Sequence, residues 1–286
     1  CLGCHAPDEA QQIARLGRPA TAGVIHALPA APPGPAWSEG VDCAACHLAD
    51  GVLLAARPPS ALAESMHPIR YEADLSDERL CARCHEFPFQ NHSPPWPFTY
   101  GETPAQETIT EWRSSAAAAR GDTCQTCHMG AAGHGFPGAH TAALVRDALT
   151  VEVSVAPDGT VQATIRAADA PHRVPTGDPF RRILFELCED PACTHVVATQ
   201  SLRRVYTSTE TTWRLVEDRS LPPARPGAPS YAVLTSRPEA LVTAWRLSYR
   251  FGDPRFEPHL PPEAIGYVIH QGRLPSAGGG SRPEPR

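Results

Sequence analysis

The sequence has no run of about 18 apolar residues, the length that a membrane-spanning helix needs. It also has no lysine, and its formal net charge of -6 argues against the basic surface of a nucleic-acid-binding protein. A charged segment followed by an apolar one is missing at the start, so we expect that any export signal has already been removed. Methionine is scarce as well, because Met66 and Met129 are the only two in 286 residues.

Cysteine is abundant by contrast, with ten residues. Eight of them form four Cys-x-x-Cys pairs, and a histidine follows each pair directly. This motif is typical of covalent c-type haem attachment, in which two thiols bond to one edge of a porphyrin and the next imidazole faces the iron. The thiols are Cys1, Cys4, Cys43, Cys46, Cys81, Cys84, Cys124 and Cys127, and the proximal ligands are His5, His47, His85 and His128.

Other uses of paired cysteines explain this pattern less well. A zinc ribbon does not require a histidine after every second cysteine. A disulfide scaffold is typical of much shorter chains, and a thioredoxin-like redox motif occurs once, near a βαβ pattern. The sequence therefore predicts four haem c groups.

The last two cysteines, Cys188 and Cys193, lack a following histidine and flank a Glu-Asp-Pro turn between β-rich segments. We expect a local disulfide here, which indicates an oxidising compartment. A fifth, irregular haem site is the alternative, and the spacing disfavours it.

Each haem needs a ligand on its second axial position, and this ligand decides the chemistry. Met129 adjoins His128 and cannot reach the opposite haem face, while Met66 adjoins a better ligand, His67. Nine histidines lie outside the motifs, which is enough to make every haem bis-histidine and six-coordinate. We rank His67 and His134 first as distal ligands, then His26 and His172, with His140 and His92 in reserve. The remaining three are expected to be structural: His195, His259 and His270.

The first half of the chain repeats a haem motif every 38 to 43 residues. A segment of this length cannot build a sizeable core alone, so residues 1–147 are predicted to form a tetrahaem domain that wraps around its porphyrins. Short helices are expected around the motifs, one with a Ser76–Arg79 capping pattern. Another is expected to run from Gln106 into the fourth motif, with Gly121 as a stop.

The second half has the alternating pattern of β-strands. Apolar and polar residues alternate on both sides of Asp158-Gly159, which predicts a β-hairpin. Further short strands follow, separated by Pro- and Gly-rich turns, so residues 148–275 are predicted to form an antiparallel β-sandwich. Residues 276–286 are expected to be a flexible tail. The fold class is therefore α+β.

Several segments resemble those of multihaem c-type cytochromes with a C-terminal β-sandwich: CARCHEF, TPAQETITEWRSS, GDTCQTCHMG, HGFPGAH and PHRVPTGDPFRR. The match covers about residues 75–190, and the haem motifs extend it to Cys1. The resemblance implies that His172 is a distal ligand through which the sandwich braces the haem domain. It also implies that either His134 or His140 is a distal ligand, and leaves open which one.

Four saturated haems in one chain predict electron transfer rather than catalysis. An enzyme of the nitrite- or hydroxylamine-converting type would need one open iron, and histidine is in excess here. The chain is also similar to tetrahaem subunits of extracellular cytochrome filaments, so its partners are other redox proteins or copies of itself; a soluble periplasmic electron shuttle is the alternative. Haem attachment outside the cytoplasmic membrane implies an exported protein, extracellular or periplasmic.

Overall fold

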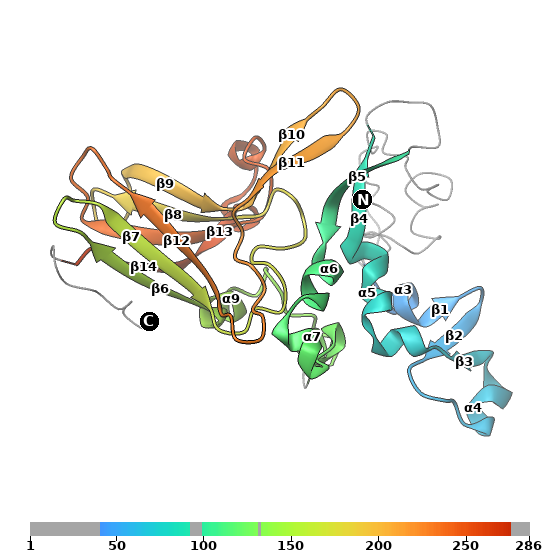
Figure 1. The fold of residues 1–286 in the computed structure, drawn as a ribbon. Helices are drawn as coiled ribbons and strands as arrows, with labels where there is room; N and C mark the ends of the chain where they lie inside the picture. Colours follow the sequence, from blue (N-terminus) through green and yellow to red (C-terminus); the bar gives the residue numbers. More distant parts are fainter. Residues whose placement is uncertain (1–40, 92–98, 131–132, 276–286) are drawn as a thin grey trace. The chain divides into compact units, whose positions relative to one another are not determined.

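The computed structural model describes residues 41–91, 99–130 and 133–275. The fold is α+β, and the chain divides into two compact units (Figure 1). The first unit holds the described residues up to Pro104, together with Thr123–Gln125 and Ser208–Arg214. The second holds Ala105–Asp122, Thr126–Thr207 and the described residues from Leu215 onward. The division predicted from the sequence, at residues 147 and 275, stays a prediction.

Short helices alternate with short strands from residue 43 to residue 107. In chain order they are α3 (Cys43–His47), β1 (Leu48–Ala49), β2 (Val52–Ala55), α4 (Ala61–Met66), β3 (Ile69–Tyr71), the 3-10 helix η2 (Ala73–Ser76), α5 (Glu78–His85), β4 (Glu86–Gln90) and β5 (Tyr100–Glu107). Strand β2 pairs with β1 in antiparallel and with β3 in parallel orientation. Strands β4 and β5 form a separate two-stranded sheet.

The helix predicted from Gln106 through the fourth motif is three helices instead of one. They are α6 (Thr108–Arg113), α7 (Ala116–Arg120) and α8 (Cys124–His128), and Gln106 belongs to β5. The break after α6 has a local cause: the Ser115 hydroxyl accepts a hydrogen bond from the Ala118 amide (3.2 Å) and so begins a new helix. Gly121 ends α7 in the left-handed conformation, with φ of +84°, and the predicted stop is confirmed.

The predicted cap of α5 is also corrected. Ser76 lies at the end of η2, and Asp77 is the N-cap, whose carboxylate accepts from the Arg79 amide (2.8 Å). Aspartate and serine are both good N-cap residues, so the sequence pattern placed the start one residue early.

A β-sandwich dominates the second unit (Figure 1). One sheet has the strand order β12-β7-β6 and the other has the order β14-β13-β8-β9. Their bounds are β6 (Leu149–Val155), β7 (Val161–Ala167), β8 (Arg182–Cys188), β9 (Val196–Leu202), β12 (Ser230–Ser236), β13 (Ala244–Arg250) and β14 (Gly266–Arg273). The remaining elements from residue 142 onward are α9 (Ala142–Ala148), the hairpin β10 (Arg204–Ser208) with β11 (Trp213–Asp218), η3 (Glu257–His259) and α10 (Pro262–Ile265); residues 208–214 of the hairpin belong to the first unit.

The predicted hairpin at Asp158-Gly159 is confirmed. Strands β6 and β7 pair in antiparallel register from Leu149↔Ala167 to Val155↔Val161. Gly159 has φ of +82°, a conformation that side-chain-bearing residues rarely adopt. The Asp158 carboxylate accepts from the Thr160 amide (3.0 Å) and fixes the turn.

The core of the sandwich comes from the inner faces of both sheets. Val151 and Ile165 face inward from the first sheet, and Phe185, Trp245 and Leu247 from the second; all are at most 1% exposed. Burial of one such side chain contributes about 1.5–3 kcal/mol to folding. The apolar content of the second half thus forms a core that is independent of any cofactor.

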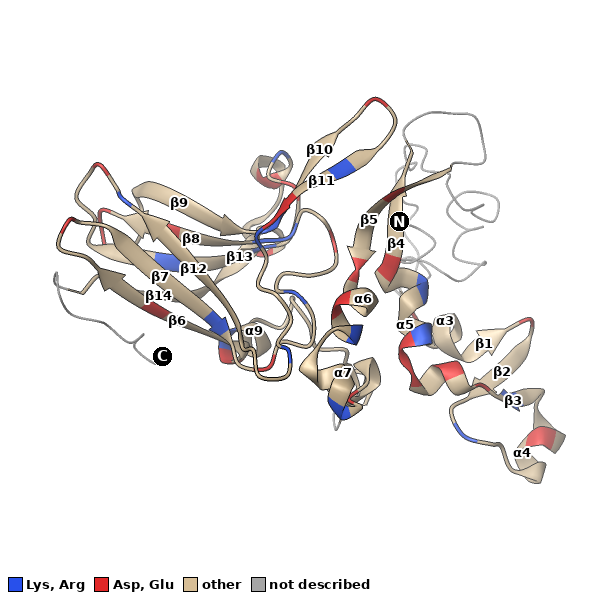
Figure 2. Ribbon diagram, viewed as in Figure 1, with Lys and Arg blue, Asp and Glu red and all other residues tan. Residues whose placement is uncertain are grey.

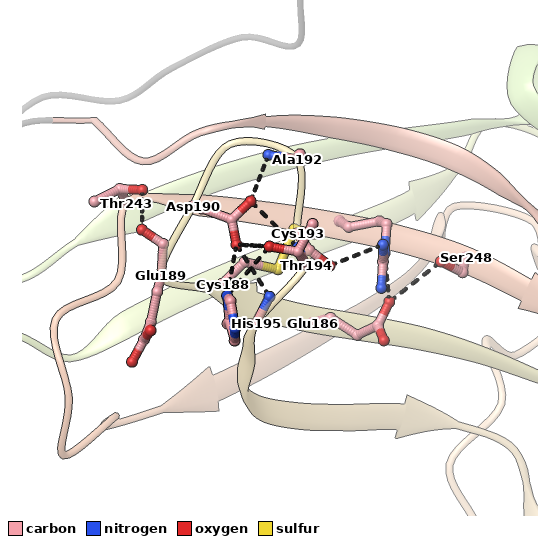
Figure 3. The surroundings of a disulfide bond; sticks show 11 residues. Glu186, Cys188, Glu189, Asp190, Ala192, Cys193, Thr194, His195, Thr243 and Ser248 are labelled. Atoms are coloured by element: carbon pink, nitrogen blue, oxygen red, sulfur yellow. Dashed lines mark hydrogen bonds and ion pairs between the residues drawn. A yellow bond between two sulfur atoms is a disulfide. The ribbon is translucent and has the colours of Figure 1, made fainter.

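Cys188 and Cys193 are joined by a disulfide across the turn between β8 and β9 (Figure 3). Asp190 lies inside this loop, and its carboxylate accepts hydrogen bonds from the amides of Ala192 (3.0 Å), Thr194 and His195 (each 3.0 Å) and from the Thr194 hydroxyl (2.8 Å). These donors lower the pKa of Asp190 to about 2, with the His195 amide as the largest cause.

The pKa of Asp190 is lower in the folded chain than in the unfolded chain. The ionised carboxylate therefore stabilises the fold at any pH above its unfolded pKa, and this stabilisation is lost as the pH falls through about 2. We predict that Asp190→Ala unfolds at lower denaturant concentration than the wild type at neutral pH. The difference should shrink between pH 4 and pH 2, as measured by denaturant unfolding with the disulfide intact. A difference that is independent of pH would show that the carboxylate charge has no part in it.

Candidate functional site

Three of the four Cys-x-x-Cys-His motifs lie in the described residues, and each occupies the end of a helix. They form α3, the second half of α5, and α8, and each helix ends at the motif histidine. Residues at positions i, i+3 and i+4 of a helix share one face, so one turn presents two thiols and an imidazole to the same side. None of the six motif cysteines described is in a disulfide. This donor set fits the two vinyl groups and the iron of one haem c.

The first motif, with Cys1, Cys4 and His5, lies outside the described residues, as do the distal candidates His26 and His92.

The second motif begins at a capped helix and ends at an oriented imidazole. The Asp42 carboxylate accepts from the Ala45 amide (3.1 Å) and starts α3. His47 Nδ1 lies 2.9 Å from the Leu54 carbonyl oxygen on β2. A carbonyl oxygen only accepts, so Nδ1 carries the proton and the lone pair is on Nε2. That tautomer is the one a metal ligand needs, and the hydrogen bond holds the ring in place.

Two residues of the fourth motif, Cys124 and Gln125, contact α5 and the segment before it. Gln125, the residue after the first cysteine of the fourth motif, donates its side-chain amide to the carbonyl oxygens of Asp77 (2.7 Å) and Leu75 (3.3 Å). The first cysteines of the two motifs, Cys81 and Cys124, are within hydrogen-bonding reach, and this contact together with burial raises the pKa of the Cys81 thiol. The first cysteines of the third and fourth motifs are therefore neighbours within the first unit.

Acidic and basic residues both lie along α5, where the ribbon of Figure 2 is coloured red and blue. The Arg79 guanidinium binds Asp77 (2.5 Å) and Asp74 (3.0 Å). The hydrogen bond from Arg79 lowers the pKa of Asp77, so this carboxylate stays ionised as the cap of the helix. The segment that Gln125 contacts is thus fixed from both sides.

His128, the proximal candidate of the fourth motif, lies opposite His172, a distal candidate 44 positions later in the sequence. Their ring centroids are 6.3 Å apart and their planes differ by 10°. His128 Nδ1 donates to the Pro137 carbonyl oxygen (2.6 Å), and His172 Nδ1 donates to the Arg173 carbonyl oxygen (2.9 Å). Both imidazoles therefore have their lone pair on Nε2. Both residues belong to the second unit.

The separation of these two rings fits one metal ion. A metal–imidazole nitrogen bond is about 2 Å long and the ring centre lies about 1 Å beyond the nitrogen, so two imidazoles that held one iron between them would have centroids about 6 Å apart. Rings in direct face contact are closer, as His140 and Phe251 are at 4.1 Å. The residues present thus fit a bis-histidine iron at the fourth motif.

The other described distal candidates have different surroundings. His67 is exposed at the C-cap of α4, and His134 lies edge-on to Phe136, with centroids 6.2 Å apart. His140 stacks on Phe251, and burial lowers its pKa. Nothing in these surroundings assigns a haem to them, so all three stay candidates.

The three histidines expected to be structural lie in the second unit. His270 Nε2 lies 2.8 Å from the Leu149 carbonyl oxygen, which links β14 to β6. The Thr194 hydroxyl lies 3.2 Å from His195 Nδ1 in the disulfide loop. His259 ends η3.

Sequence reasoning missed two residues that shape this site. Gln125 carries no signal beyond its place inside a haem motif. Glu111 is a buried carboxylate in α6, and its partners Arg173 and Thr176 follow His172 closely in the sequence. The available signals were the polar, turn-like HRVPTG segment and the resemblance of TPAQETITEWRSS, which contains Glu111, to multihaem cytochromes; neither indicates that the two segments meet.

The fold is similar to that of a multihaem c-type cytochrome. The solved structure is that of a pentahaem cytochrome c552 from Thermochromatium tepidum, with a TM-score of 0.62 and 20% sequence identity. The alignment covers 96% of this chain and 83% of that chain. No protein-family model matches the sequence, and no curated protein matches it. No helix in the described part of the chain has the length and apolar character to cross a bilayer.

We predict that His172→Ala converts one haem per chain from low-spin to high-spin, because an iron held by His128 and His172 would then lose one of its two imidazole ligands. Electron paramagnetic resonance of the oxidised protein measures this change. His270→Ala is the matched control: it also removes a second-unit imidazole, but one whose Nε2 meets a carbonyl oxygen. Unchanged spectra in His172→Ala would exclude the His128–His172 pair.

Proposed function

We propose that this chain is an exported electron-transfer protein that carries four haem c groups, one on each Cys-x-x-Cys-His motif. The observation that carries the proposal is the pair His128 and His172, two imidazoles of the right tautomer separated by the width of one iron site. The likeness of the fold to a pentahaem cytochrome supports it. Bound haem supplies a one-electron change of iron oxidation state.

The chain's own residues hold and orient the cofactors. The thiols bond covalently to the porphyrins: Cys1, Cys4, Cys43, Cys46, Cys81, Cys84, Cys124 and Cys127. The proximal imidazoles are those of His5, His47, His85 and His128. Backbone carbonyls fix the rings of His47 and His128 through Nδ1 and increase the basicity of Nε2.

Two histidines on one iron leave no position for a substrate, which supports an electron carrier over an enzyme. His172 fills the position opposite His128, and the further candidates for the other irons are His26, His67, His134 and His140, with His92 in reserve. The competing proposal is a redox enzyme of the nitrite- or hydroxylamine-converting type, which needs at least one five-coordinate iron.

The contact between the third and fourth motifs supports transfer within the chain. Gln125 and the pair Cys81–Cys124 bring the anchors of two cofactors together. Closely spaced cofactors exchange electrons without any moving part, so the role of these residues is to fix a distance.

We further propose that the chain is the repeating subunit of an extracellular filament in which electrons pass from copy to copy. The sequence resemblance to filament subunits and the surplus of histidines support this assembly. The alternative is a soluble periplasmic shuttle that passes electrons to other redox proteins.

Purified native protein tests the cofactor and the assembly. We expect a haem-to-protein ratio of four by pyridine haemochrome assay, only low-spin haem in the oxidised state, and filaments in negative-stain electron microscopy. Single particles with the same spectra would favour the shuttle. A high-spin signal that responds to nitrite or cyanide would instead favour the enzyme.

We also predict that Gln125→Ala weakens the redox interaction between the two cofactors of the third and fourth motifs, since it removes the two hydrogen bonds from the fourth motif to the segment that precedes the third. A spectroelectrochemical titration measures the mutual shift of the two midpoint potentials. Unfolding should also become easier by about 1 kcal/mol.

The matched control for this variant is Gln200→Ala, which removes one side-chain bond to the Thr235 carbonyl in the sandwich (3.3 Å). It should leave the potentials unchanged. Equal titration curves for Gln125→Ala and the wild type would show that this contact does not set the spacing.

A further inference from the structure

The loop that carries His172 is held by its neighbour Arg173 on one side. Arg173 Nε pairs with the Asp218 carboxylate (3.0 Å), and the next residue, Val174, exchanges two backbone hydrogen bonds with Leu221 (3.0 and 2.9 Å). The Arg173 carbonyl oxygen accepts from His172 Nδ1. The orientation of the imidazole therefore depends on where the Arg173 backbone lies.

Glu111 fixes that backbone from the other side. Its carboxylate oxygen Oε2 accepts from the Arg173 amide (3.1 Å) and from the Thr176 hydroxyl (2.6 Å). Thr176 has one hydroxyl hydrogen and donates it to Glu111, so the Thr108 hydroxyl, 2.9 Å away, donates to Thr176. Helix α6 thus forms hydrogen bonds with both ends of the Arg173–Thr176 segment.

Burying a carboxylate costs desolvation free energy, so its hydrogen bonds to the loop must offset that cost. Glu111 is 5% exposed, and burial raises its pKa. Hydrogen bonds from Thr176 and Arg173 and the positive charge of Arg204 act in the opposite direction. Arg204 is itself buried and donates to the Gly177 carbonyl, which closes the same loop. The two charges and the loop form one cluster inside the second unit.

We propose that Glu111 is a positioning residue, which holds the His172 loop so that the imidazole faces His128 at the distance of an iron ligand. This inference rests on the proposed function, because it takes His172 as an axial ligand. Glu111 acts through Arg173 and Thr176.

The test uses the full holoprotein with Glu111→Ala and Glu111→Gln. The alanine variant removes both acceptor bonds, and we expect one haem per chain to lose its low-spin signal when oxidised and to bind carbon monoxide when reduced. The glutamine variant places its amide oxygen where Oε2 lies and keeps both bonds. It should rescue the low-spin signal and bind no carbon monoxide.

A matched control separates positioning from stability. Glu186 is another buried carboxylate of the second unit, 6% exposed, bonded to Arg246 (2.8 Å) and Ser248 (3.3 Å). Glu186→Ala should lower stability with all haems still low-spin. If Glu111→Ala behaves in the same way, Glu111 is merely structural and the proposal is wrong.

Two further variants keep the outcome decisive. If Glu111→Ala does not mature, Thr176→Val removes one of the two bonds and should shift the midpoint potential of the same haem; an unchanged potential contradicts the proposal. His172→Ala separates a failure of the positioning role of Glu111 from a failure of the ligand role of His172. If it opens one haem and Glu111→Ala opens none, only the positioning role fails, whereas wild-type spectra in His172→Ala overturn the ligand assignment itself.

Discussion

Few apolar side chains are buried among the described residues of the first unit, and this scarcity limits how that part of the chain can be held together. Among its described residues, only Leu54 and Leu75 are buried apolar side chains, whereas the sandwich buries a continuous cluster from two sheets. So little buried surface does not offset the conformational entropy of an ordered chain. Porphyrins bound at the four motifs, as proposed, would supply further apolar surface. The polypeptide would then surround the porphyrins and be bonded to them at the motif cysteines.

Fixed attachment needs oriented side chains, and the same device recurs at three imidazoles. His47, His128 and His172 each direct Nδ1 at a backbone carbonyl oxygen. The hydrogen bond selects the tautomer and holds the ring, so less order has to be created when a metal is bound. At His172 the residue that supplies the carbonyl oxygen is itself held. Arg173 donates its backbone amide to Glu111 and pairs its guanidinium with Asp218.

Much of this could be predicted from the sequence. Motif spacing indicates the haem anchors, alternation indicates the strands, and Asp158-Gly159 indicates the hairpin that the structure contains. The misplaced elements share one cause: Ser115 and Asp77 compete locally with their neighbours to begin a helix, and a pattern of residue types does not show which one succeeds. The site was harder to predict, because Glu111 meets Thr176 across 65 residues.

Features that depend on short spacing can be read from the residues alone: the thiol pairs with their histidines, the strand pattern and the disulfide loop. Such features involve residues within one helical turn or one hairpin, where backbone geometry alone determines which side chains are in contact. The folded chain is needed to see that His172 lies near His128, that Glu111 bonds to the residue after His172, and that Gln125 bonds to the segment before the third motif. Those contacts join distant segments, and their partners are chosen by the packing of whole elements, which no local pattern records.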